Sequence, residues 1–237
     1  MSVSDAQNPT IIDDFIAPAC KAHIKILYQD DDILLVSKPS GLLSLSGKNP
    51  LNRDSVHYRL VHGQEGVTPA FPQAKLPHRL DFGTSGVMVV ALNAASAKHL
   101  NQQFMAGTVK KRYLAILEGW VDEGQGRISA PIAKDKTQFP RVKICHATGK
   151  QAVSEYTVLK RWDEPRRTLV EFSPQTGRTH QLRIHSLVMG HPILGCDLYH
   201  SECSEHSADR LLLHASELYF EHPTSGKQIR GESPCPF

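Results

Sequence analysis

The fold of this chain is best predicted from one stretch, His78-Arg79-Leu80-Asp81-Phe82-Gly83-Thr84-Ser85-Gly86. Pro77 precedes it and favours an extended chain at the residue before the proline. An apolar, β-branched run, Val87-Met88-Val89-Val90-Ala91-Leu92, follows it and predicts a buried strand. The Asp81 carboxylate is therefore expected on a loop that leads into a rigid strand, where catalytic groups are common.

The remaining pattern predicts many strands and a few helices. We expect helices from 54 to 61 with Asp54 as N-cap, from 94 to 106 between Asn93 and Gly107, and from about 179 to 189, closed by Gly190. Because strands and helices do not alternate strictly, the pattern predicts an α+β fold on a mixed or largely antiparallel sheet. The expected strands cover residues 24–28, 33–36, 112–117, 142–146, 152–162, 168–172, 211–220 and 227–231.

Composition is that of a globular protein, with 40% hydrophobic and 22% charged residues among 237. Residues 1–22 are polar and lack periodicity, which predicts a flexible arm, and residues 23–237 are expected to form the folded domain. No apolar stretch approaches the roughly 20 residues that span a bilayer, and the N-terminus lacks the features of a secretory signal. The five cysteines are scattered, so we expect a cytoplasmic protein with reduced thiols and no membrane partner.

The net charge is only +3, but the basic residues are clustered. Lys110, Lys111 and Arg112 are consecutive, and the segment 134–150 has five basic residues and one acid, Asp135. Such clusters attract a phosphate backbone, although an ordinary solvated basic face is the alternative. The basic residues of the segment are Lys134, Lys136, Arg141, Lys143 and Lys150.

A second informative stretch is Gly177-Arg178-Thr179-His180-Gln181-Leu182-Arg183-Ile184-His185. Its histidines are five residues apart, whereas the zinc-protease motif places them four apart around a glutamate, so a metal pair is disfavoured. A helix start that presents Arg178 and Arg183 to an anion is one interpretation, and a surface amphipathic helix is the other.

Both stretches resemble motifs of the RluA-type pseudouridine synthases. Four further segments resemble that family in the same order, and the resemblance runs from about Ile26 to the C-terminus. It implies an α+β synthase domain with a central cleft, an isomerase that needs no cofactor or metal, and a structured RNA as substrate; we expect a monomer. The four segments are 31–41, 111–115, 190–195 and 210–215.

Many members of that family carry an S4-type RNA-binding domain before the first motif, and here the motif comes too early for one. The resemblance therefore points to the compact branch of the family, whose members modify tRNA and 23S rRNA. The expected targets are uridine 32 of the tRNA anticodon stem-loop, uridine 746 of 23S rRNA, or both, with another tRNA or rRNA uridine as the alternative.

The resemblance also implies roles for single residues. Asp81 is the catalytic carboxylate, either a nucleophile at C1′ or a base at C2′, and Arg183 pairs with it to favour the ionised form. Tyr113 stacks on the uracil, with an ordinary strand tyrosine as the alternative. A turn-capping role at Thr84 or Ser85 is the alternative for Asp81.

The expected substrate-binding residues surround these three. Arg79 fills the space that an extruded uridine leaves or holds a phosphate. Leu182 forms an apolar floor, and a core leucine is the alternative. The remaining members are Arg178, His180, Lys38 and Thr84, with Lys38 as part of the cleft wall.

Two other classes of protein stay open on the residues alone. A catalytically silent RNA-binding protein on the same fold is disfavoured by the presence of Asp81, Tyr113 and Arg183. A glycoside hydrolase usually needs two carboxylates at the scissile bond, and the motifs offer one. Cys196, His200, Cys203 and His206 lie within eleven residues, but this spacing is too compressed for a usual zinc finger.

We expect activity to survive EDTA and to need no nucleotide, because the sequence has no phosphate-binding loop and no metal cluster of usual spacing. The measurement is product formation by dialysed enzyme with and without the chelator. A loss that zinc reverses and magnesium does not would implicate the Cys196–His206 segment. Reversal by magnesium would implicate RNA folding.

Overall fold

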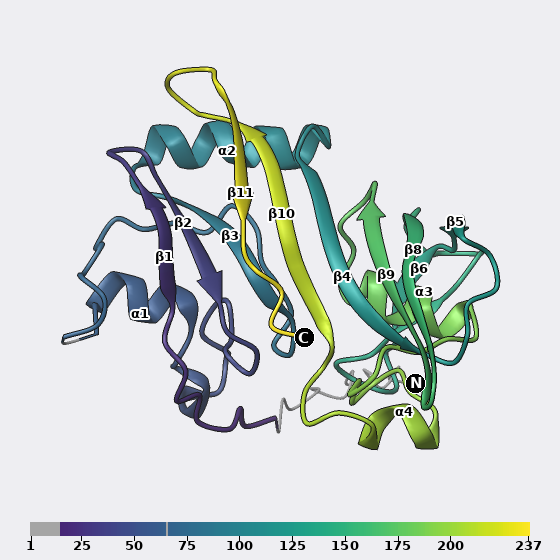
Figure 1. Cartoon of the computed structure of the whole chain (residues 1–237). Helices are drawn as coiled ribbons and strands as arrows, with labels where there is room; N and C mark the ends of the chain where they lie inside the picture. Colours follow the sequence, from purple (N-terminus) through teal and green to yellow (C-terminus); the bar gives the residue numbers. More distant parts are fainter. Residues whose placement is uncertain (1–14, 65) are drawn as a thin grey trace, which may run out of the picture.

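The computed structural model describes residues 15–64 and 66–237 and has a mixed nine-stranded sheet (Figure 1). Its strand order is β1-β2-β3-β10-β4-β9-β8-β5, with β11 paired to β10. Only β3 and β10 run parallel, and the other pairs are antiparallel. The bounds are β1 Lys25–Gln29, β2 Ile33–Lys38, β3 Ser85–Ala91, β4 Lys110–Glu118, β5 Gln125–Ser129, β8 Val153–Asp163, β9 Arg166–Pro174, β10 Leu213–Glu221 and β11 Gln228–Glu232.

A separate two-stranded sheet and a few helices complete the fold. None of the helices in the described ranges is long and apolar enough to cross a bilayer. The α+β prediction with a mixed sheet is confirmed. The elements are β6 Ile132–Lys134, β7 Val142–Ile144, η1 Pro50–Asn52, α1 Val56–His62, α2 Ala94–Ala106, α3 Gln181–Val188 and α4 Glu202–His206.

Nearly every residue of β2 and β3 is buried, because these strands lie between two helices. Successive side chains of a strand point to opposite faces. Leu34, Val36, Met88 and Val90 pack with the α1 residues Val56 and Leu60. Ile33, Leu35, Val87 and Val89 pack with the α2 residues Ala97 and Leu100. Both faces of this half of the sheet are therefore buried.

The helix ends agree with the predictions in part. Asn93 caps α2 by accepting from the Ser96 N–H, and Gly107 ends it in the left-handed conformation, as predicted. The N-cap of α1 is Ser55, so the prediction of Asp54 is wrong. The Asp54 carboxylate accepts two hydrogen bonds from Arg59, and the Ser55 hydroxyl accepts from the Tyr58 N–H instead.

Residues 1–14 of the predicted arm lie outside the described residues. Residues 15–22 have no regular secondary structure, but they contact the domain. Arg59 donates to the carbonyls of Cys20 and Ala22, and the Ala17 N–H donates to Asn52. The division of the chain at residue 22 stays a prediction.

The sheet has two halves, β1-β2-β3 and β10-β4-β9-β8-β5, and they meet at Gly86. This residue pairs with Ala215 across the parallel β3–β10 contact and has a φ of +125°. A Cβ atom at Gly86 would lie 2.2 Å from the Ala215 carbonyl oxygen. Only glycine fits this junction, because the obstructing atoms belong to a backbone that is already paired in the sheet.

Gly86 is the second residue of β3, the strand that follows the Asp81 loop, and side chains and main chain of segment 38–44 donate hydrogen bonds to the carbonyl groups of that loop. Ser44 donates to Leu80 O and Ser40 donates to Gly83 O. Phe82 O accepts from the Gly41 N–H at 3.0 Å and from Lys38 Nζ at 3.2 Å. Buried carbonyls need such partners, so this segment sets the path of the backbone on both sides of Asp81.

Lys38 is a charged side chain with 0% exposure. Its Nζ donates to three carbonyls, those of Pro39, Leu42 and Phe82. Burial lowers the pKa of Lys38 to about 7, and the charge of Asp81 opposes that shift. The side chain joins the end of β2 to the residue directly after Asp81.

We expect Gly86→Ala to lower the free energy of unfolding by about 3 kcal/mol or more, because rigid backbone opposes the new methyl group. Gly107→Ala is the matched control, since Gly107 also has a positive φ of +72°, but a Cβ added there would meet no atom within 4 Å. It should cost about 1 kcal/mol. Urea denaturation measures both, and equal costs would contradict the account of the junction.

We expect Lys38→Met to lower the free energy of unfolding by about 3 kcal/mol, because buried carbonyls then lose their donor. Lys25→Met at an exposed position of β1 is the control and should cost less than about 0.5 kcal/mol. Limited proteolysis should show a more accessible Asp81 loop in the Lys38 variant alone. Unchanged stability and proteolysis would show that the three contacts are dispensable.

Candidate active site

A cavity of about 650 Å³ lies where the two halves of the sheet meet. Asp81 and Arg79 reach it from the loop before β3, and Tyr113 reaches it from β4. Arg178, Leu182 and Arg183 reach it from the start of α3 and the loop before that helix. The volume is in the range that small-molecule sites occupy. Six of the nine predicted site residues thus line one cavity.

The Asp81 carboxylate faces this cavity without a partner. Within residues 15–64 and 66–237 it accepts no hydrogen bond and forms no ion pair. The Thr84 N–H donates to the main-chain carbonyl of Asp81, so the turn is closed without the side chain. The alternative that Asp81 caps this turn is therefore not supported, and its carboxylate is available to a ligand.

Tyr113 lies at the boundary between the two halves of the core. It packs against the cluster under α3 and also against the cluster under α1. Burial raises the pKa of its phenol, and the charge of Asp81 raises it further. The phenol is therefore protonated at neutral pH and lies close enough to Asp81 for the two groups to interact.

Arg183 is a buried cation, with 4% of its side chain exposed. We expected it to pair with Asp81, but its guanidinium bonds Asp197 and Cys196, because the loop with these two residues packs against it. Burial acts to lower the pKa of Arg183, while its contact with the Cys196 sulfur and the carboxylates of Asp197 and Asp81 raise that pKa above its ordinary value. The guanidinium therefore stays charged close to Asp81.

His180 does not line the cavity, in contrast to the expectation that it binds substrate. It is the N-cap residue of α3 with a φ of +53°, and its Nδ1 lies 3.0 Å from the Tyr199 hydroxyl. That hydroxyl also accepts from the Val142 N–H. Burial lowers the pKa of His180, which keeps the ring neutral behind the site.

Lys38 and Thr84 also lie outside this cavity. Thr84 is buried in the turn after Asp81, and Lys38 lines a different cavity on the other side of the Asp81 loop. Both support the loop and neither lines the cavity with Asp81. Leu182 lines the cavity and also packs in the core, so its position is compatible with both interpretations, and its role toward the substrate stays a prediction.

Three residues that the sequence reasoning missed shape the cavity. Lys111 lines it from β4, donates to Thr176 O, and has a pKa lowered by burial. Gln181 accepts from the Arg178 N–H and donates to Val153 O, which fixes the loop before α3. Phe104 stacks on the ring of His78 at 4.6 Å. Strand alternation with Tyr113 was the available signal for Lys111.

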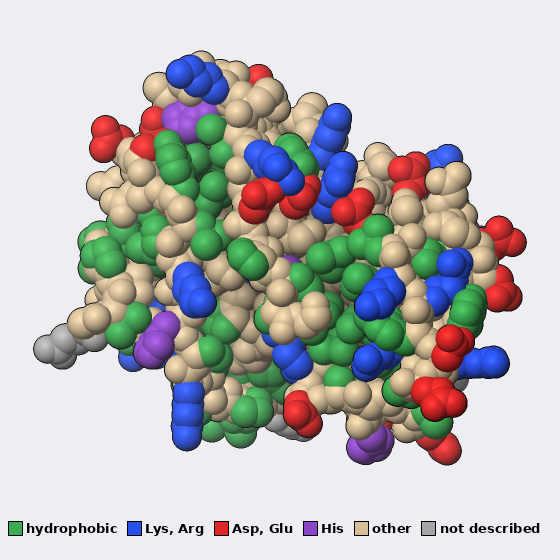
Figure 2. All heavy atoms as spheres, viewed as in Figure 1, with side chains coloured by type: hydrophobic (Ala, Val, Ile, Leu, Met, Phe, Trp, Pro, Cys, Tyr) green, Lys and Arg blue, Asp and Glu red, His purple; other side chains and the backbone are tan. Residues whose placement is uncertain are grey.

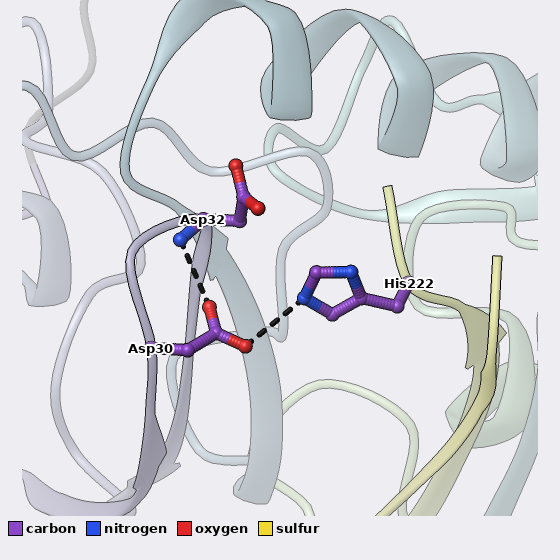
Figure 3. Close-up of side chains that lie close together, drawn as sticks. All are labelled: Asp30, Asp32 and His222. Carbon is purple, nitrogen blue, oxygen red and sulfur yellow. Dashed lines mark hydrogen bonds and ion pairs between the residues drawn. The ribbon is translucent and has the colours of Figure 1, made fainter. Parts of the chain in front are cut away.

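Asp30, Asp32 and His222 form the one group of at least three potential metal ligands among the residues described (Figure 3). Asp30 accepts from Tyr28 and from His222 Nε2, and His222 Nδ1 accepts from two backbone N–H groups. Hydrogen bonds from Thr224, Asn93 and Ser96 lower the pKa of Asp32. The lone pairs of these groups are engaged in joining the β1–β2 turn to the β10–β11 turn and α2.

The four side chains of the compressed Cys/His segment do not converge. Cys196 is buried against Arg183, and Cys203 is exposed on α4. His200 Nδ1 lies 3.5 Å from the Glu205 carboxylate, and His206 Nδ1 lies 3.5 Å from the main-chain carbonyl oxygen of Glu202 in its own helix. The segment therefore forms a short capped helix, α4, that the sequence reasoning did not predict.

Comparison with known proteins identifies the family. Residues 32–187 match the model for RNA pseudouridylate synthases. The dual-specificity RNA pseudouridine synthase RluA of Yersinia pestis is 45% identical over 212 residues, 90% of this chain and 99% of the relative. RluA of Escherichia coli K12 is 41% identical over 220 residues, covering 93% and 97% of the two chains.

A solved structure agrees with the sequence relatives. The human RNA pseudouridylate synthase domain containing 1 is 30% identical with a TM-score of 0.73, covering 93% of this chain and 86% of that one. The family model and the relatives each cover most of the chain. The chain therefore belongs to the RluA-type RNA pseudouridine synthases, which are isomerases.

Proposed function

We propose that this enzyme converts uridine to pseudouridine in tRNA and 23S rRNA with Asp81 as its catalytic group. The proposed targets are uridine 32 of the anticodon stem-loop and uridine 746 of 23S rRNA. The relatives named dual-specificity RluA support this choice, since they are similar over nearly the whole chain. The observation that carries the site assignment is the unpaired Asp81 carboxylate in a cavity shared with Tyr113 and Arg183.

The reaction moves no group out of the site. The bond from C1′ to N1 of the uracil breaks, the base turns, and a bond from C1′ to C5 forms. The proton on C5 is lost and N1 gains one, so the reaction is redox-neutral and needs no cofactor. Asp81 acts as a nucleophile at C1′ or as a base at C2′, and both roles require the ionised carboxylate.

A paired or stacked uridine must leave its helix to reach Asp81, at a cost of a few kcal/mol. Arg79 lines the cavity and has no side-chain partner among the residues described, so it is available to fill the vacated space or bind a phosphate. In this proposal Tyr113 stacks on the uracil, Leu182 supports it, and the charges of Lys111 and Arg178 attract nearby phosphates.

The basic segment around β6 and β7 is the proposed site for the body of the RNA. Lys134, Lys136 and Lys143 are exposed, although Lys143 lies 3.9 Å from Asp135. The consecutive cluster is less available, because Arg112 pairs with Glu171 and Glu217. On the face in Figure 2, Lys and Arg side chains lie among acidic ones. We place a monomeric enzyme in the cytoplasm, where tRNA and rRNA are modified.

We expect Asp81→Asn to abolish pseudouridine formation while RNA binding stays within a few-fold of wild type. The amide has nearly the shape of the carboxylate but is neither nucleophilic nor basic. Asp209→Asn, an exposed aspartate outside this cavity, is the matched control and should retain full activity. The measurement is single-turnover product formation and filter binding on an anticodon stem-loop.

Two results would contradict the assignment. Appreciable pseudouridine from a sequence-verified Asp81→Asn preparation would remove Asp81 from the chemistry. Binding of RNA by wild type without any product on either RNA would favour the silent RNA-binding protein on this fold.

A further inference from the structure

Arg183 lies between two cavities. It lines the cavity that contains Asp81, and it also lines a second one of about 910 Å³. Asp197, Asp209 and Lys38 line the second cavity, which lies on the other side of the loop around Phe82 and Gly83. The groups that bind Arg183 from this second side therefore decide how its guanidinium is presented to Asp81.

The guanidinium is held on one edge and on one face. Nε and Nη2 each donate to the Cys196 sulfur at 3.4 Å, and Nη2 also donates to Asp197 Oδ1. The Tyr199 ring lies against the guanidinium, with its centroid 5.5 Å from Cζ. Nη1 has no hydrogen-bond partner among the residues described and is not buried away from solvent.

This arrangement limits the motion of Arg183 more than it stabilises the protein. A guanidinium is a rigid planar fork, so holding Nε and Nη2 also sets the direction of Nη1. Asp197 has 67% of its side chain exposed, so solvent screens its charge and the ion pair adds little to folding stability. Cys196 is fully buried and supplies the deeper, weaker acceptor.

We propose that Asp197 is a positioning residue for the reaction: it holds Nη2 of Arg183 so that Nη1 is presented to the Asp81 side of the site. The inference rests on the proposed function and on the role of Arg183 within it. Asp197 itself touches neither the substrate nor Asp81. Its removal leaves the guanidinium held only by the weaker Cys196 sulfur acceptor and the Tyr199 ring, so Arg183 turns more readily about its last side-chain bonds and the fraction of correctly oriented sites falls.

The test compares Asp197→Asn and Asp197→Ala with wild type in single-turnover reactions on an anticodon stem-loop. Asparagine keeps an acceptor oxygen without the charge, whereas alanine removes both. We expect alanine to lower the single-turnover rate at saturating RNA by at least about ten-fold and asparagine to lower it less. RNA affinity and the thermal midpoint should stay at the wild-type values, because Asp197 is exposed.

Asp209→Asn is the matched control, because Asp209 is exposed in the same second cavity and has no hydrogen bond or ion pair within the described ranges. It should react at the wild-type rate. The decisive readout is coupling with Arg183→Met. Because Asp197 acts through Arg183, the double variant should be no slower than Arg183→Met alone.

Three results would overturn the inference. The first is a wild-type single-turnover rate for Asp197→Ala. The second is that Asp197→Ala lowers the rate by the same factor in the Arg183→Met background as in wild type. The third is that Asp197→Ala weakens only RNA affinity, so that saturating RNA restores the full rate. Failure of the proposed function looks different, since wild type then forms no pseudouridine at all and both conclusions fall. With active wild type and any of the three results, the proposed function stands and only the positioning role is lost.

Discussion

The buried ammonium of Lys38 is the contact on which the arrangement of the site depends. Its three carbonyl partners include Phe82 O, which belongs to the residue after Asp81. A loop in the interior cannot leave its carbonyls unpaired, and here the segment from Lys38 to Ser44 donates to them. The Asp81 carboxylate is therefore not needed to hold the loop, because hydrogen bonds to the main-chain carbonyls on both sides of it hold the loop.

The parallel junction of β3 and β10 brings the other side chains of the cavity to that loop. Gly86 lets β10 approach β3 in parallel, and β4 then pairs with β10, which places Tyr113 next to the loop. From the opposite side, Gln181 fixes the loop before α3, so that Arg178 stands at the rim and Arg183 inside. Burial acts on each group differently: it keeps Tyr113 protonated and His180 neutral, whereas nearby acceptors keep Arg183 charged.

The sequence predicted the features that are local or that recur as motifs. The strand after Asp81, the caps of α2 and six of the cavity-lining side chains could all be read from neighbouring residues or from the family resemblance. The Asp54 prediction failed because two adjacent residues were both good caps and the choice depended on Arg59, five residues away. The short elements β5, β6 and α4 have weak periodicity and were missed, since only tertiary pairing stabilises them.

The partner of Arg183 differs from the prediction: Asp81 was expected, and the structure has Cys196 and Asp197. No pattern in the stretch 177–185 indicates that the loop with Cys196 and Asp197 returns beneath it, because that contact depends on how the loop after α3 packs. The same applies to His180, whose position in the motif suggested substrate contact but whose left-handed backbone directs the ring to Tyr199. Motifs predicted which residues belong to the site, and the tertiary structure decides which of them line the cavity.

The central claim is that uridine isomerisation in cellular RNA depends on Asp81. The most direct measurement maps pseudouridine at single-nucleotide resolution in tRNA and 23S rRNA from cells that lack this protein and from cells complemented with wild type or with Asp81→Asn. The account predicts that the modification at uridine 32 and uridine 746 disappears without the protein and returns with wild type alone. Unchanged modification in the deletion strain, or its return with Asp81→Asn, would contradict the account.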